Sequence, residues 1–163
     1  MKRIGLLSDT HGYVHPAIYN HFEDCNEIWH CGDMGSVDVA LELKLFKPLI
    51  GVYGNIDDFD IRNRYPKFQR FKCEEVDVLL THIGGYPGNY DFAVREIMKT
   101  EPPQLFACGH SHILKVMHDN TYNVLHINPG AAGKSGFHKV ITFVKFEIDK
   151  KDIKNLSVIE LAK

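Results

Sequence analysis

Short apolar runs alternate with longer amphipathic segments along the first third of the chain. Strands are predicted over 3–8, 27–31 and 48–53, where apolar residues cluster in short runs. Helices are predicted over 15–24 and 36–46, where apolar residues are interspersed with polar ones. Strands that alternate with helices form βαβ units, so this part of the chain predicts a parallel sheet.

Strands become the main predicted element in the rest of the chain. Two strands over 68–73 and 76–82 are joined at Glu74-Glu75, and a helix over 90–100 ends before a pair of prolines. Further strands are predicted over 105–108, 113–117, 122–127, 138–147 and 153–160. A parallel part followed by an antiparallel part predicts an α/β fold with two facing sheets and helices outside. No repeat or long linker divides the sequence, so a single domain over 1–163 is expected.

The composition is that of an ordinary globular protein. Apolar residues make up 44% of the 163 residues, and 19 Lys and Arg against 21 Asp and Glu give a formal net charge of -2. An apolar fraction this high with so little net charge disfavours disorder. Proteins that bind nucleic-acid polymers or anionic membranes usually carry a strongly basic surface, so neither kind of partner is expected.

The cysteines and the first residues of the chain indicate where the protein works. Cys25, Cys31, Cys73 and Cys108 are far apart and form no C-x-x-C pair, which argues against a disulfide scaffold or a thiolate zinc site. Reduced, mostly buried thiols are expected instead. The apolar run over 4–7 is too short for a signal peptide or a membrane span. We therefore expect a cytoplasmic protein.

Polar residues gather where the predicted strands end. Asp9-Thr10-His11 follows the first strand, Asp33 the second, Asn55 the third, His82 the strand over 76–82, and His110-Ser111-His112 the strand over 105–108. The carboxyl ends of parallel strands share one edge of a sheet, where the binding crevice of such folds lies. These segments are therefore expected to converge at one site, and they account for four of the ten histidines.

The residue types at these strand ends suit transition metals. Asp-x-His and His-x-His offer oxygen and imidazole donors two residues apart, and sets without thiolate suit Mn, Fe, Zn, Co or Ni. Seven donors are too many for one ion with open positions, but they suit two ions about 3.5–4 Å apart that share a carboxylate. The competing interpretation, in which each residue only caps a turn or a helix, explains single positions but not the whole set.

Five short motifs occur in an order that resembles a known family. They are SDTHG at 8–12, HCGD at 30–33, GNID at 54–57, TH at 81–82 and GHSH at 109–112, followed by NPGA at 128–131. The chain resembles the calcineurin-like metallophosphoesterases over nearly its whole length. The resemblance is to the small bacterial and archaeal phosphodiesterase branch, which also contains the retromer-subunit relatives.

This resemblance implies a fold, a ligand set and a reaction. It implies a four-layer α/β/β/α sandwich with two mixed sheets. Asp9, His11 and His112 would hold one divalent ion, Asn55, His82 and His110 would hold the other, and Asp33 would bridge them. Manganese is the expected metal, with Fe, Zn, Ni or Co as alternatives. A small phosphodiester would be attacked by a metal-bridging hydroxide, so that Asp33, Asn55 and His82 would be the catalytic residues.

One position departs from the larger members of this family. Many of them carry a histidine directly after the asparagine, where this sequence has Ile56 followed by Asp57. The small branch commonly lacks this histidine too, so the departure concerns only the general acid. The leaving group would depart unaided, or it would take a proton from water, from Asp57 as a neighbour of the metal site, or from a loop histidine.

Other functions stay open at this point. A phosphomonoesterase would use the same centre, and retromer-subunit relatives use the fold as a protein-binding scaffold with little or no activity. A homo-oligomer is compatible with the sequence. Of the other histidines, His30 and His138 lie near motif loops and are candidates for contacts with the ligands or the substrate, whereas His15, His21, His118 and His126 are expected at the surface or the edge of the core.

Overall fold

The first of two five-stranded sheets combines strands from both ends of the chain. The computed structural model describes residues 1–163. The sheet contains β1 (Lys2–Leu7), β2 (Glu27–His30), β3 (Leu49–Gly51), β11 (Val140–Asp149) and β12 (Asp152–Ala162), in the order β12-β11-β1-β2-β3. β1, β2 and β3 run parallel, whereas β11 pairs antiparallel with β1 and with β12.

The second sheet is also mixed. It contains β4 (Phe68–Cys73), β5 (Val76–Thr81), β8 (Leu105–Ala107), β9 (Lys115–Asp119) and β10 (Val124–Asn128), in the order β4-β5-β8-β10-β9. Its central strands β5, β8 and β10 are parallel, and its outer strands are antiparallel to their neighbours. A separate small hairpin is formed by β6 (Gly85–Tyr86) and β7 (Asn89–Tyr90).

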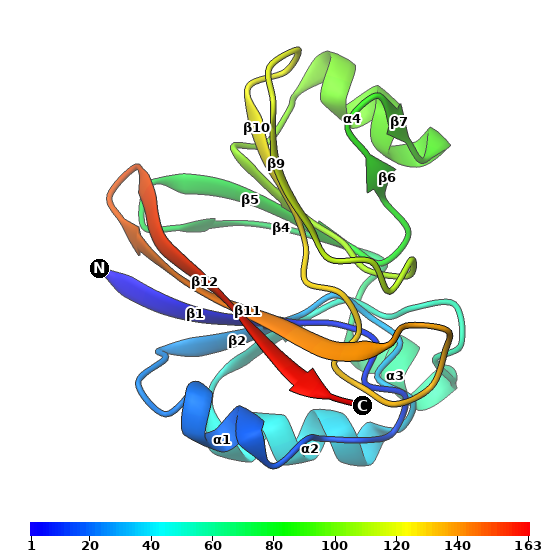
Figure 1. Ribbon diagram of the computed structural model, residues 1–163. Coiled ribbons are helices and arrows are strands. Elements are labelled where there is room, and N and C mark those ends of the chain that lie inside the picture. The colour runs from blue at the N-terminus through cyan, green and yellow to red at the C-terminus, as the bar shows by residue number, and fades with distance from the viewer.

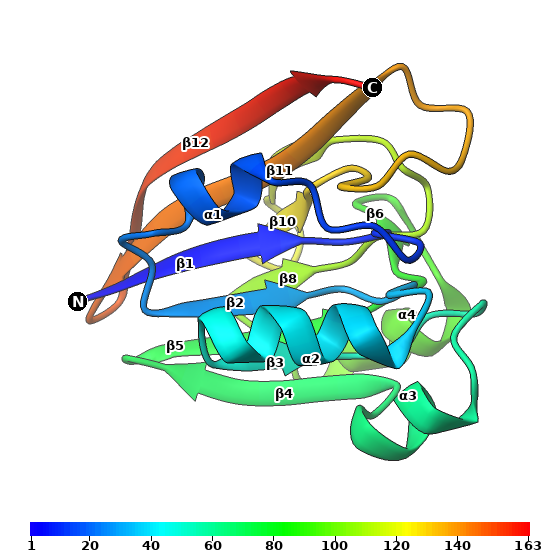
Figure 2. The ribbon, with the colours of Figure 1, turned by 90° about the horizontal axis from the view of Figure 1, so that it is seen from below.

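Helices lie on the outer faces of the two facing sheets. α1 (Ala17–His21) and α2 (Val37–Phe46) cover the first sheet, and α4 (Phe92–Thr100) covers the second (Figure 1). α3 (Phe59–Arg64) lies beside the loops at one end of the sheets (Figure 2). The result is the four-layer α/β/β/α arrangement that the family resemblance implied.

Alternation of side chains along the strands explains the layers. In β5, Val76, Val78 and Leu80 belong to the core between the two sheets, whereas Leu79 points to the core beneath α4. In β11, Val144, Phe146 and Ile148 also fill the space between the sheets, and Phe143 packs beneath the first pair of helices. Because successive side chains of a strand point to opposite faces, β5 and β11 are buried on both sides.

The structure confirms the α/β class and the two facing sheets, with differences in detail. The predicted helix over 15–24 is shorter, since only Ala17–His21 is helical. The strands over 138–147 and 153–160 do not form a separate antiparallel sheet, because β11 and β12 extend the first sheet. α3 and the β6–β7 hairpin were not predicted. All four cysteines are buried and free, and no helix is long and apolar enough to cross a membrane.

Candidate metal centre

Five loops meet at the carboxyl edge of the two sheets. Backbone hydrogen bonds hold them together beyond the ends of the strands: Asp9 N donates to Gly32 O at 2.9 Å, and His11 N donates to Asp33 O at 3.0 Å. Gly109 N donates to His82 O at 2.9 Å, which joins the loops after β5 and β8. The sequence therefore brings its motif residues together by continuing the pairing of neighbouring strands.

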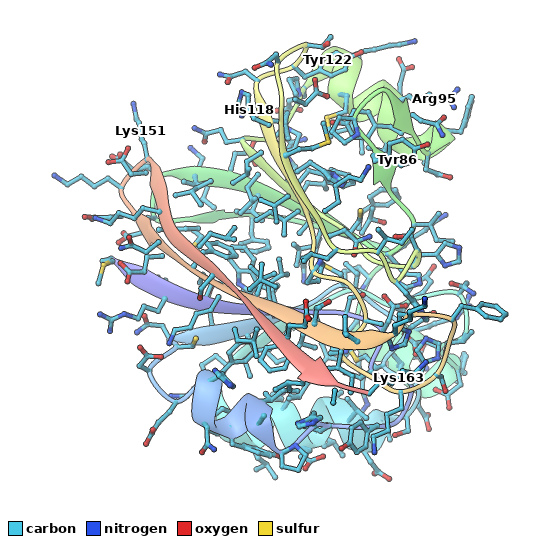
Figure 3. All side chains as sticks on the ribbon, viewed as in Figure 1. Tyr86, Arg95, His118, Tyr122, Lys151 and Lys163 are labelled. Carbon is cyan, nitrogen blue, oxygen red and sulfur yellow. The ribbon has the colours of Figure 1, made fainter.

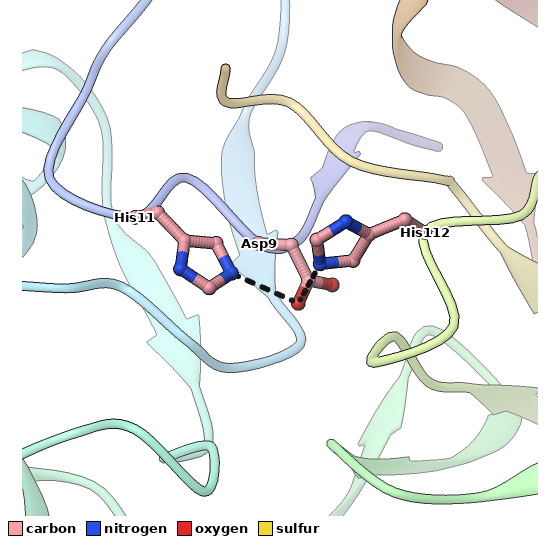
Figure 4. A group of neighbouring side chains, drawn as sticks. All are labelled: Asp9, His11 and His112. Carbon is pink, nitrogen blue, oxygen red and sulfur yellow. Dashed lines mark ion pairs between the residues drawn. The ribbon is translucent and has the colours of Figure 1, made fainter. Parts of the chain in front are cut away.

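The first cluster contains Asp9, His11 and His112 (Figure 4). Asp9 Oδ1 lies 3.6 Å from His11 Nε2 and 3.2 Å from His112 Nε2. The other carboxylate oxygen, Asp9 Oδ2, accepts hydrogen bonds from Ser8 Oγ at 2.7 Å and from His110 N at 3.0 Å. The carboxylate is thus fixed on one side and directs its second oxygen toward the two histidines.

The second cluster contains Asp33, His82 and His110. His82 Nε2 lies 3.1 Å from Asp33 Oδ2, which also lies 3.6 Å from Nε2 of His11 in the first cluster. Asp33 Oδ1 accepts a hydrogen bond from Ile56 N at 3.1 Å, so this carboxylate is also fixed by backbone. Asp33 is therefore placed between the two clusters, where a shared ligand has to lie.

Asn55 and Asp57 occupy different environments on the loop after β3. Asn55 is exposed and lines a small cavity together with Gly54 and His82. Asp57 is buried, and its two oxygens accept hydrogen bonds from the backbone N–H groups of Gly54 at 2.8 Å, Gly35 at 2.9 Å and Met34 at 3.2 Å. Asp57 thus fastens the loop that carries Asn55 to the loop that carries Asp33.

The backbone of the two clusters is unusual. Nine non-glycine residues of the chain have a positive φ, and five of them belong to the predicted ligand set: Asp9, His11, Asp33, His110 and His112. The other four include Glu74 and Lys150, which lie in tight turns between strands. A positive φ is uncommon for residues with a side chain, and such conformations concentrate at functional sites.

Glycines allow the loops to approach the two carboxylates closely. A Cβ atom at Gly109 would lie 2.6 Å from Asp9 Oδ2 and would overlap Ser8 Oγ. A Cβ atom at Gly54 would overlap Asp33 Oδ1. Both positions therefore exclude a larger residue as long as the carboxylates keep their orientation.

The two buried carboxylates are surrounded by histidines. Burial alone would raise the pKa of Asp9, but the close contacts with the His11 and His112 rings outweigh burial and hold that pKa well below its ordinary value. Burial opposes ionisation of Asp33 in the same way, and the contact with His82 lowers its pKa. Both carboxylates are therefore ionised at neutral pH, and no Lys or Arg forms an ion pair with either. Such a site attracts cations.

Atoms without hydrogen-bond partners show that the donor set fits metal ions. Asp9 Oδ1, His11 Nε2 and His82 Nε2 are buried and have no partner in the protein. His82 Nδ1 donates to Cys31 O at 2.7 Å, which leaves the lone pair of Nε2 directed at Asp33. Buried polar atoms normally have hydrogen-bond partners. Three unpartnered atoms that face one another and that all have lone pairs therefore indicate that a bound cation coordinates them.

Several residues of this region were placed wrongly or missed by the sequence analysis. His126 is fully buried rather than at the surface or the core edge, and His30, a candidate for contacts with the ligands or the substrate, is fully buried as well. His30 accepts from Gly32 N at Nδ1 and contacts Thr10 Oγ1 through Nε2, so it supports the loops of both clusters. Arg62 donates to Asp57 O and Asn55 O and lies over the ring of Tyr53. Asp58 is a recognisable N-cap residue that predicts the start of α3. The position of Arg62 one turn into that helix could therefore have been predicted from the sequence.

Two cavities flank the second cluster. The larger, of about 700 Å³, is lined by His110 and by residues of the β6–β7 hairpin and α4. The smaller, of about 220 Å³, is lined by Asn55, His82 and Arg62. Ile83 lines both cavities, so they adjoin each other on either side of the cluster.

Known proteins share this architecture. Residues 1–151 match the model of the calcineurin-like phosphoesterase superfamily domain. A probable metallophosphoesterase of Methanothermobacter thermautotrophicus is 29% identical over 136 residues, which cover 78% of this chain and 76% of the relative.

Solved structures agree with this assignment. An archaeal phosphodiesterase superposes with a TM-score of 0.76 at 25% identity and covers 98% of this chain and 99% of its own. Vps29 of Entamoeba histolytica in complex with zinc has the same fold, with a TM-score of 0.73 at 14% identity over 98% of each chain. The matched domain spans the motif loops and both candidate clusters, and the chain belongs to the calcineurin-like phosphoesterase superfamily.

Proposed function

We propose that the protein is a dinuclear metal-dependent phosphodiesterase that hydrolyses a small phosphodiester. The observation that carries this proposal is the position of Asp33, whose Oδ2 lies 3.1 Å from His82 of one donor cluster and 3.6 Å from His11 of the other. A carboxylate between two sets of nitrogen and oxygen donors is the arrangement that a pair of divalent ions requires.

The donor chemistry is compatible with manganese, the metal that we propose. Asp9, His11 and His112 would hold one ion and His82, His110 and Asn55 the other, with Asp33 shared. These oxygen and imidazole donors include no thiolate, which also leaves Fe, Zn, Ni and Co as suitable ions. Divalent ions bound there would stabilise charge on the phosphoryl oxygens and would make water a stronger nucleophile at neutral pH.

The chain's own residues would position these groups. His82 is oriented by its hydrogen bond to Cys31 O, and Asp33 by the hydrogen bond that it accepts from Ile56 N. Asp57 has both oxygens occupied by backbone N–H groups, so its role is to hold the loops in place rather than to deliver a proton. The leaving group would therefore depart without help, or it would take its proton from water or from a loop histidine.

The two adjoining cavities favour a diester over a monoester. A phosphodiester carries two organic groups on one phosphate, and a monoester carries only one. Cavities of about 700 Å³ and 220 Å³ share Ile83 beside the second cluster, so each organic group of a diester would have a cavity of its own there. The positive charge of Arg62 in the smaller cavity suits an anionic ester.

Hydrolysis of two chromogenic esters tests the proposal. The purified protein is expected to hydrolyse bis(p-nitrophenyl) phosphate with Mn²⁺, faster than p-nitrophenyl phosphate, and to lose this activity with a chelator. Asp33→Asn is expected to abolish it. A protein that binds metal but turns over neither ester would be a binding scaffold, and a preference for the monoester would identify a phosphomonoesterase. Both results contradict the proposal.

A further inference from the structure

Most of the larger cavity is built from elements outside the predicted ligand motifs. It lies between the β6–β7 hairpin, α4 and the second sheet, and Tyr86 and Arg95 mark this part of the molecule in Figure 3. Gly109 and His110 form the wall that it shares with the second cluster. Its volume of about 700 Å³ is within the range of cavities that bind small organic molecules. A substrate with its phosphate at the metals would therefore extend into it.

Two cations line this cavity without forming an ion pair. Lys115 Nζ lies 4.5 Å from the centroid of the Tyr86 ring, and Arg95 Nε donates to the backbone oxygen of Tyr90 at 2.7 Å. The one carboxylate in the lining, Asp91, caps α4 by accepting from Ala93 N. Two cations against one carboxylate favour a ligand with negative charge.

Exposed aromatic side chains surround the same cavity. Tyr86 is 45% exposed and Phe92 is 83% exposed, although both line the cavity. Tyr90 is different, because it is buried and donates its hydroxyl hydrogen to Asp119 Oδ2 at 2.6 Å. Phe92 and the face of Tyr86 that Lys115 does not cover are therefore free to pack against a planar group of a ligand.

A buried histidine lies at the floor of the cavity. His126 lines it, is fully buried, and has no hydrogen-bond partner at either ring nitrogen. A neutral imidazole has one donor and one acceptor, and an unmade hydrogen bond of a buried group is costly. The floor thus offers a donor and an acceptor to a polar group that enters the cavity.

We infer that this cavity binds the nucleoside group of a nucleotidyl phosphodiester, which is retained while the other ester group leaves. The inference rests on the proposed phosphodiesterase function and adds its substrate class. A nucleobase combines a planar ring for Tyr86 with ring donors and acceptors for His126, whereas a plain alkyl group offers neither. Lys115 and Arg95 supply N–H donors for the carbonyl and hydroxyl oxygens of the nucleoside.

Two esters with the same leaving group test this inference. Thymidine 5′-(p-nitrophenyl) phosphate and methyl p-nitrophenyl phosphate both release p-nitrophenolate and differ only in the retained group. Wild-type protein with Mn²⁺ is expected to show a higher kcat/KM for the thymidine ester. Tyr86→Ala is expected to reduce the thymidine-to-methyl ratio at least about fivefold, the effect of losing one stacked contact. Lys115→Ala removes the cation that lies against the Tyr86 ring and is expected to reduce the ratio in the same direction. An unchanged ratio in both variants would overturn the inference.

Lys151→Ala is the matched control for the lysine variant. Lys151 is exposed in the turn between β11 and β12, far from Tyr86 in Figure 3, and its loss is expected to change neither ester.

A binding measurement keeps the inference separate from the proposed function. If wild-type protein hydrolyses neither ester, the phosphodiesterase proposal fails, and calorimetric titration of the Mn²⁺-loaded protein with thymidine 5′-monophosphate still tests the cavity. Binding at least about fivefold tighter than that of methyl phosphate, with the difference lost in Tyr86→Ala and in His126→Phe, would support the nucleoside site. Equal affinities for the two phosphates would overturn it.

Discussion

The Nδ1 atoms of His112 and His138 lie 3.2 Å apart, and His138 Nε2 lies 2.7 Å from the carbonyl oxygen of Gly133. A carbonyl only accepts, so His138 donates through Nε2. Burial lowers the pKa of His138, which keeps it neutral with its lone pair on Nδ1. That lone pair accepts the hydrogen on His112 Nδ1. The lone pair of His112 Nε2 is thereby directed at Asp9 and the first cluster.

Replacement of His138 is therefore expected to weaken metal binding. In His138→Phe the acceptor for His112 is lost, and the affinity for Mn²⁺ measured by calorimetry should fall about tenfold, as is usual when a partner of a metal-ligating histidine is removed. His118→Phe is the control, because His118 is exposed on β9. Equal affinities of His138→Phe and wild-type protein would show that His138 does not orient His112.

Replacement of Asp33 is expected to reduce the stabilisation of the folded protein by Mn²⁺. Wild-type protein is expected to gain about 2.7 kcal/mol of unfolding free energy for each bound ion at a Mn²⁺ concentration of about 100 times Kd, because the ions bind only the folded chain. Asp33→Asn removes the carboxylate between the two clusters and should gain far less. Thermal unfolding with and without Mn²⁺ gives both values. A variant that is stabilised as much as wild-type protein would contradict a shared role of Asp33.

Asp57 is expected to matter for stability. Its carboxylate accepts three backbone hydrogen bonds, and Asp57→Asn places an amide N–H₂ group against at least one of these N–H donors. The unfolding free energy should fall by about 2 kcal/mol or more, the cost of leaving buried donors without an acceptor. Asp58→Asn is a matched control, since Asp58 caps α3 and asparagine caps a helix equally well. Urea unfolding of the two variants would show equal losses if Asp57 had no such role.

Two buried histidines predict a loss of stability in acid. Burial lowers the pKa of His30 to about 3 and that of His126 to about 4, from an ordinary value of 6.5. Between pH 6.5 and about 4 the unfolded chain therefore binds more protons than the folded protein. The unfolding free energy should fall with decreasing pH, by about 1.4 kcal/mol per pH unit for each histidine.

Replacement of His126 checks this pH dependence. His126→Phe keeps an aromatic ring beneath the larger cavity but removes one titrating group, so the slope of unfolding free energy against pH should decrease by about 1.4 kcal/mol per pH unit. His118→Phe removes an exposed histidine and should leave the slope as it is. The idea fails if both variants keep the wild-type slope in urea unfolding at a series of pH values.

The sequence indicated the strand ends better than the sheet to which each strand belongs. Gly, Asp and His follow the ends of β1, β2 and β8 in the sequence. Glycine allows the loops to approach closely, and Asp and His are the candidate metal ligands, so these residue types locate the ends of the strands. The apolar pattern of β11 does not show which sheet it joins. Val144 and Phe146 face one core while Phe143 faces another, and this two-sided burial suits a strand in either sheet.

The residues that shape the larger cavity could be predicted only in part. Val124 and His126 share a parity along β10, and Val124 packs in the core beneath α4, so alternation could have placed the His126 ring on that face. Lys115 and Arg95 carried no comparable signal. Their positions beside the cavity follow from the packing of β9 and α4 against the second sheet, which depends on contacts between distant segments.

The positive φ angles of the ligand residues mean that the metal centre is formed at a cost to the stability of the fold. His110 and His112 hold φ angles of 70° and 61°, a conformation that glycine adopts at lower cost than histidine. Glycine at either position would relieve the backbone while removing a donor. A selection for thermal stability alone would therefore be expected to return glycine at these loop positions. The selected protein would be more stable but inactive, because the same positions supply the metal ligands.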